Sequence, residues 1–193
     1  MPTLVLTAIG DERPGLVEEL AAVVAARGAS WDRSSMARLG SKFAGIVEVS
    51  VSEDEIESLV ADLAELSSAD ALQIHVEQGV EQGVEQGVEH GVARSGAAAA
   101  DLAAVDVSFT ASLIGQDRPG IVHEISREIA AAGVSIVELR TATMSAPMSA
   151  ETLFEATATL SAPRDVDRQE LAERLEAIAD ELMVDLDIEV TPA

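Results

Sequence analysis

The segment Gly10–Val17 occurs twice in this chain, and its second copy is Gly115–Val122, 105 positions later. The copies read GDERPGLV and GQDRPGIV, so each carries an acidic residue, an Arg-Pro pair and a Gly directly before a helix-like apolar run. Glycine lets a ligand approach the backbone closely, and unpaired N–H groups at a helix start attract an anion such as a carboxylate. We therefore predict two anion-binding corners, the first at residues 10–16 and the second at 115–121.

The runs on either side of each corner predict the elements that hold it. A strand-like run precedes each corner, Leu4 to Ile9 in one case and Val105 to Ile114 in the other. A helix-like run follows, Leu16 to Arg27 or Ile121 to Ala132, with apolar residues at helical spacing. Each corner is therefore expected to be a strand-to-helix loop.

The remaining elements also repeat between the halves. Two extended runs follow each first helix, then a second helical run and a final alternating strand. The order in each half is β-α-β-β-α-β, which predicts the ferredoxin-like arrangement of the α+β class: an antiparallel four-stranded sheet with two helices on one face. We expect domains at residues 1–77 and 104–193, separated by a linker at 78–103.

The linker region repeats the sequence Val-Glu-Gln-Gly from Val76 onward. A glycine in every turn costs about 1 kcal/mol relative to alanine, which disfavours a stable helix. We therefore predict a flexible low-complexity linker, with a helix that continues into Ala97 to Ala100 as the alternative.

Composition excludes several classes of function. The formal net charge is −23, both halves are acidic, and aromatic residues are 2% of the chain, which argues against direct nucleic-acid binding. The chain has no Cys, its three His share no spacing, and no apolar run reaches the length of a membrane span. We expect a cytoplasmic protein without a metal site or cofactor. No nucleophile and base are suggested by spacing, so we expect no enzymatic activity.

The corner motif carries a resemblance to a known family. Ile-Gly-x-(Asp/Glu)-Arg-Pro-Gly-(Leu/Ile)-Val, followed by Gly28-Ala29-Ser30 or Gly133-Val134-Ser135, resembles the ACT domain. Two copies in one chain resemble the double-ACT proteins of the glycine cleavage system transcriptional repressor family. The likeness covers both halves and leaves out only the linker.

This resemblance implies amino-acid binding at the corners, usually where two ACT units pair. The ligand carboxylate would meet N–H groups near the helix starts, its ammonium would face an acidic corner residue, and the start of the next strand would close the pocket. The best-known serine-binding ACT sites use Asn, which this chain lacks, so serine bound in that geometry is not implied. The candidate binding residues are Gly10, Asp11, Glu12, Arg13, Pro14, Gly15, Leu16, Ser30, Trp31, Gly115, Gln116, Asp117, Arg118, Pro119, Gly120, Ile121, Ser135 and Ile136.

The implied role is a regulatory sensor of glycine or another small amino acid. Its implied partner is a protein such as a transcription activator, rather than DNA or a membrane. Open sheet edges favour a homodimer or an intrachain pair of sheets. One alternative is a scaffold whose corners bind no ligand, because Gly and Pro could serve turn geometry alone and Arg13 and Arg118 could pair with nearby carboxylates. The other is the regulatory portion of an amino-acid metabolic enzyme.

Overall fold

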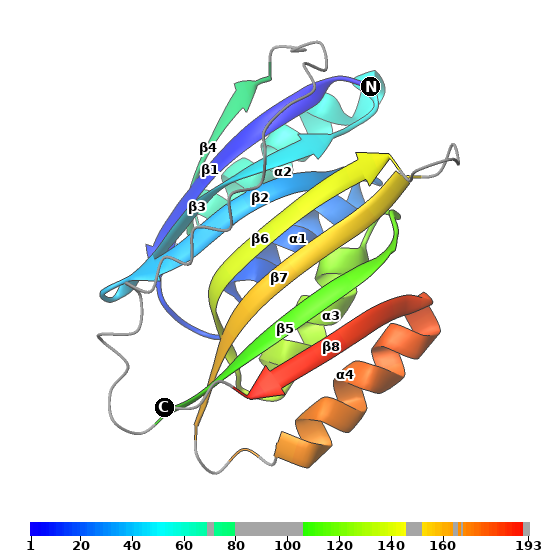
Figure 1. The fold of residues 1–193 in the computed structure, drawn as a ribbon. Coiled ribbons are helices and arrows are strands. Elements are labelled where there is room, and N and C mark those ends of the chain that lie inside the picture. Colours follow the sequence, from blue (N-terminus) through cyan, green and yellow to red (C-terminus); the bar gives the residue numbers. More distant parts are fainter. Residues whose placement is uncertain (69–71, 80–105, 146–151, 164–165, 167, 191–193) are drawn as a thin grey trace, which may run out of the picture.

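One antiparallel sheet of eight strands runs through the described part of the chain, with helices covering one of its faces (Figure 1). The computed structural model describes residues 1–68, 72–79, 106–145, 152–163, 166 and 168–190. Each half has the predicted βαββαβ order, and the α+β class is confirmed. The first half consists of β1 (Thr3–Asp11), α1 (Leu16–Ala26), β2 (Ser30–Leu39), β3 (Lys42–Ser50), a 3-10 turn (Glu53–Glu55), α2 (Ile56–Ser68) and β4 (Leu72–Gln78). The second consists of β5 (Asp106–Gln116), α3 (Ile121–Ala131), β6 (Ser135–Ser145), β7 (Thr152–Pro163), α4 (Arg168–Leu182) and β8 (Val184–Val190).

The two four-stranded sheets join edge to edge within the chain. The strand order is β4-β1-β3-β2-β6-β7-β5-β8, so β2 of the first half pairs with β6 of the second (Figure 1). We call this β2–β6 pairing the seam. On its buried side, the hydroxyls of Ser34 and Thr141 lie 3.0 Å apart and share a hydrogen bond. The intrachain pair of sheets is thus observed, whereas the homodimer stays a prediction.

The hydrophobic core continues across the seam. Alternate residues of β1, namely Leu4, Leu6 and Ala8, are buried beneath the helices, as the strand periodicity predicts. Helices α1 and α3 also pack against each other, and one apolar cluster contains buried residues of both halves. The halves therefore share a core.

The expected domain limits at residues 77 and 104 stay predictions, because little of the chain between the halves is described. Strand β4 ends at Gln78, one residue beyond the expected limit of the first domain. The expected linker at 78–103 lies almost wholly outside the described residues, so both of its interpretations stay predictions. In the described ranges, no helix combines the length and apolar character needed to cross a membrane.

Candidate functional site at the seam

The two corners have the same backbone geometry. Gly15 and Gly120 adopt the left-handed conformation, with φ of 94° and 90°, directly before α1 and α3. A side chain there would be strained, which explains the repeated glycine. The prolines stand in the turn, one residue before that glycine.

Each corner is also anchored to the hairpin beside it. The Glu12 N–H donates to the Ser41 carbonyl at 2.9 Å, and the Asp117 N–H donates to the Thr152 carbonyl at the same distance. These bonds occupy the amides at the beginning of each loop. Free amides for a ligand must therefore come from the helix starts.

The corner arginines pair with their own helices. Arg13 Nη2 lies 2.7 Å from Glu19 Oε2, and Arg118 Nη2 lies 2.8 Å from Glu124 Oε2. This is the pairing expected if the arginines have a structural role. Both pairs are partly exposed, so each adds little to stability.

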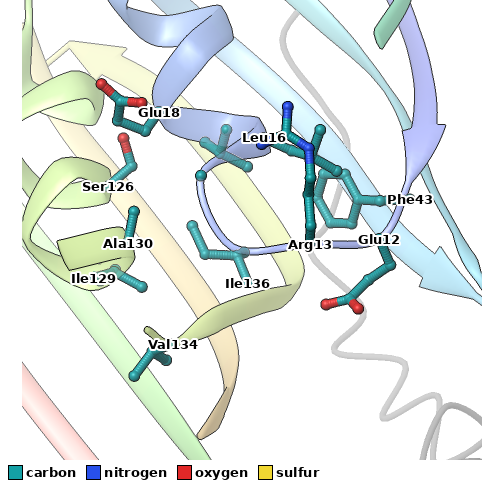
Figure 2. A pocket seen from close by; sticks show the side chains of 12 residues that line it. Glu12, Arg13, Leu16, Glu18, Phe43, Ser126, Ile129, Ala130, Val134 and Ile136 are labelled. Carbon is teal, nitrogen blue, oxygen red and sulfur yellow. The ribbon is translucent and has the colours of Figure 1, made fainter. Parts of the chain in front are cut away.

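A pocket lies at the first corner, and both halves form its walls (Figure 2). Its empty space, including the part open to solvent, is about 280 Å³. The first half contributes the corner itself, the start of α1 and Phe43 of β3, while the second half contributes α3 and the start of β6. The lining residues are Glu12, Arg13, Gly15, Leu16, Val17, Glu18, Phe43, Ser126, Ile129, Ala130, Val134 and Ile136.

The two walls of the pocket differ in polarity. The wall from the second half is mainly apolar, and the wall from the corner carries charged residues. Figure 2 shows Ile129, Ala130, Val134 and Ile136 on one side of the corner loop, with Arg13, Glu12 and Phe43 on the other. The Glu12 carboxylate is partly compensated by Arg38, whose Nη1 lies 3.9 Å away. Such a site suits a small ligand with one charged end and one apolar end.

The second corner is built from the same parts but is more polar. Ser30 Oγ, at the start of β2, donates to Asp117 Oδ2 across the two halves at 3.4 Å. Burial and the nearby Asp32 carboxylate raise the pKa of Asp117, against the smaller lowering effects of the Ser30 hydroxyl and the Arg118 backbone N–H. Trp31 is buried, with 4% of its surface exposed.

Several of the predicted site residues come together. Glu12, Arg13, Gly15 and Leu16 meet Ile136 in the pocket, and Asp117 meets Ser30 at the second corner. Asp11 instead forms an ion pair with Lys42 at 2.6 Å, with a side chain 78% exposed. Gly10 and Gly115 lie inside β1 and β5, and Ser135 begins β6 without lining the pocket. The other predicted corner residues Pro14, Gln116 and Pro119 are exposed at the surface.

Sequence reasoning missed the pocket residues outside the corner and the strand start. These are Val17, Glu18, Phe43, Ser126, Ile129, Ala130 and Val134. One usable signal was present: Ala130 and its repeat equivalent Ala25 are both small. A Cβ built on Gly15 would lie 3.9 Å from the Cβ of Ala130, and one on Gly120 would lie 3.9 Å from the Cβ of Ala25. Small residues at these two positions allow each corner to approach the opposite helix.

The described residues contain no cluster of three or more His, Asp or Glu side chains that could hold a metal ion. His75, on the edge strand β4, lies 3.5 Å from Glu77. His123, early in α3, lies 3.8 Å from Glu18 of α1. Both His contacts are therefore pairs with a single carboxylate.

Comparison with known proteins addresses the family. A search of curated proteins gave no significant match. Among solved structures, the chain is similar to an unknown protein from Galdieria sulphuraria, with 26% identity, a TM-score of 0.45 and coverage of 99% of both chains. It is also similar to a proposed glycine cleavage system transcriptional repressor, with 16% identity, a TM-score of 0.42 and coverage of 100% of this chain and 98% of that one.

The aspartate kinase of Synechocystis is a further structural neighbour, with 14% identity and a TM-score of 0.54. The match covers 96% of this chain and 28% of the kinase chain, so it bears on the fold alone. The family model described as ACT domain matches residues 2–77 and again residues 109–189. These two matches, each over one βαββαβ half, show that the chain belongs to the ACT domain family and contains the domain twice.

Proposed function

We propose that this chain is a regulatory protein that binds a small amino acid in the pocket of the first corner, between its two ACT domains. Membership of the ACT family supports the coarser part of this statement, a regulatory role that senses amino acids. We add three points to that coarser statement: which ligand binds, that it binds in this pocket, and which kind of protein receives the signal.

The observation that carries the proposal is that both halves wall the pocket. A ligand held between the corner and α3 contacts both domains, so it binds the paired arrangement more tightly than a separated one. Its binding free energy then favours that pairing, because a ligand shifts an equilibrium by its difference in affinity for the two states. This gives the bound molecule a way to change what the protein presents to a partner.

The chemistry of the pocket fits an amino acid. The start of α1 at Leu16 offers backbone N–H groups and the positive end of the helix dipole to a carboxylate. Glu12 offers a carboxylate to the ammonium group. The wall of Ile129, Val134 and Ile136 is apolar and suits a short aliphatic side chain or none. Glycine or a similarly small amino acid is therefore the proposed ligand.

We further propose that the signal passes through protein contact. A chain with a net charge of −23 repels the phosphate backbone, so DNA is a poor direct partner. A transcription activator is the kind of protein partner that we propose.

A thermal-shift panel of the twenty amino acids on the full chain tests the proposal. At 100 times its Kd, a ligand of the folded state adds about 2.7 kcal/mol, which raises the Tm. Ala130→Leu fills the pocket wall and should abolish the shift. Ala131→Leu makes the same change at the next, exposed position of α3 and should leave it intact. A flat panel at millimolar ligand would instead favour the scaffold alternative.

A further inference from the structure

Strand β8, drawn in red in Figure 1, forms one free edge of the described sheet. It pairs with β5 on one side, and among the described residues no strand pairs with its other side. Backbone N–H and C=O groups along such an edge form a ready template for another extended chain. The edge of β8 is therefore a candidate docking surface.

The side chains of β8 alternate between charged and apolar. Asp185, Asp187 and Glu189, which we call the acidic row, are exposed on the face of the sheet opposite the helices. Leu186 and Ile188 are half-buried on the other face, against the core. None of the ion pairs within the described ranges involves the acidic row. Its carboxylates, spaced about 7 Å apart along the strand, therefore lack a cationic partner beside an open backbone edge.

The free edge at β4 provides a comparison within the same chain. The register of β4 on β1 matches that of β8 on β5, which makes Gln73 and His75 the equivalents of Asp185 and Asp187. Strand β4 keeps one acid on this face, Glu77, which lies 3.5 Å from His75. The fold of the βαββαβ unit thus does not require carboxylates at the other two positions, so the extra charge on β8 calls for a different explanation.

An exposed apolar side chain stands at the beginning of the β8 edge. Met183 lies between α4 and β8 and is 85% exposed. Its φ is 55°, and no other non-glycine residue of the described ranges has a positive φ. Glycine, or sometimes asparagine, is usual at this position after a helix, because other side chains are strained there. Strained residues of this kind cluster at functional sites, which favours a contact at this end of the edge.

We propose that the β8 edge binds an extended segment of a partner protein in which Lys or Arg alternates with apolar residues. The segment adds as a further strand, and its main chain bonds to the free backbone groups of β8. Its basic side chains lie beside the acidic row, while its apolar side chains continue the face of Leu186 and Ile188 and contact Met183. This inference goes beyond the proposed function and does not depend on what the pocket binds.

A second copy of this chain fits the edge poorly. Its own free edges among the described residues carry either the same acidic row or Glu77. Like charges directly opposite each other destabilise a strand pair. Charge complementarity therefore favours a basic segment of another protein.

Fluorescence anisotropy of a fluorescein-labelled synthetic peptide tests the inference on the full chain. The peptide has the length of β8 and alternates valine with lysine, and a reference peptide has the same composition with its lysines grouped together. The alternating peptide should bind saturably and about tenfold more tightly than the grouped one, since strand addition depends on the order of side chains. Equal affinities would overturn the inference, because general attraction to a net charge of −23 would then explain the binding. No binding would mean that the acidic row only protects the edge from aggregation.

Variants assign the binding to the edge, with far-UV circular dichroism as the check of folding. Asp185→Gln combined with Asp187→His gives β8 the residues of β4 and should weaken binding about tenfold, because two cross-strand charge pairs are lost. The control combines Glu57→Gln with Glu65→Gln, which removes two charges from exposed positions of α2, beside β4 at the opposite end of the sheet. The control should leave the affinity within about twofold, and an equal loss in both variants would overturn the inference. Met183→Asn suits the left-handed backbone and should weaken binding, whereas an unchanged affinity would remove Met183 from the surface.

Hydrogen exchange distinguishes strand addition from attraction between side chains alone. Saturation with the alternating peptide should slow the exchange of backbone amides in β8, because their free groups become bonded, and should leave β4 unchanged. Binding without slower exchange in β8 would overturn strand addition. Equal slowing in β4 would overturn the role of the acidic row.

Discussion

The hydrogen bond between Ser34 and Thr141 gives a direct test of the seam, because its two hydroxyls belong to different domains. Both residues are buried, each with 5% of its surface exposed. Thr141→Val keeps the shape of the side chain but leaves the Ser34 hydroxyl buried without its partner. Ser34→Ala removes the other hydroxyl and leaves that of Thr141 buried without its partner. Each single change should cost about 1–3 kcal/mol of unfolding free energy, since a buried hydroxyl loses its compensation for desolvation.

The double variant should be less damaging than the sum of the two single variants. With both hydroxyls removed, no polar group is left unpaired, and the seam becomes apolar like its neighbours Met36 and Leu139. We expect the double variant to lie within about 1 kcal/mol of the wild type. A coupling energy of at least about 1 kcal/mol should therefore appear in the double-mutant cycle.

Urea denaturation followed by far-UV circular dichroism measures the unfolding free energy of the wild type, the two single variants and the double variant. The exposed hydroxyl change Thr157→Val on β7 serves as the control and should shift stability by no more than about 0.5 kcal/mol. If the two single effects add to within about 0.3–0.5 kcal/mol, the hydroxyls do not meet. The pairing of β2 with β6, and with it the pocket between the halves, would then have to be abandoned.

Two further predictions concern the second corner. The pKa of Asp117 is raised in the folded state. At pH values just above the ordinary Asp pKa, the folded protein therefore binds more protons than the unfolded one. The stabilising contribution of Asp117 is then lost as the pH rises through its folded pKa. The Tm of the wild type relative to Asp117→Asn should therefore fall with rising pH over that window, and a constant difference would contradict the burial of Asp117 beside Asp32, Ser30 and the Arg118 backbone. Gly115→Ala would place a Cβ against Val184, 2.8 Å from its Cβ and 3.1 Å from its Cα, so β8 must move. Thermal unfolding should show a loss of about 1–3 kcal/mol of stability, and an unchanged Tm would refute this close approach.

Much of the fold could be predicted from local pattern. The alternation in β1 and the helical spacing after each corner depend only on neighbouring residues, so they indicate strands and helices without knowledge of tertiary contacts. The repeated glycines Gly15 and Gly120 likewise indicate a left-handed backbone conformation before each helix, because few other residues tolerate it. The duplication then makes each half a check on the other.

The candidate site was only half predictable for a physical reason. The corners and the strand starts at Ser30 and Ile136 could be named because the repeat and the ACT resemblance mark them. The α3 wall could not, because whether α3 faces the first corner depends on which sheet edges join. That choice is made by contacts across the seam between residues about a hundred positions apart.

The chain's own order of residues was enough to determine two βαββαβ units, each with a glycine corner before its first helix, since these follow from short-range periodicity and backbone sterics. Tertiary structure alone decided that β2 and β6 join and that the first corner opens a pocket against α3. It also decided that Asp117 lies beside Ser30 of the other domain. Edge-to-edge pairing buries surface that no local pattern marks, so the inequality of the two corners emerges only when the halves are folded together.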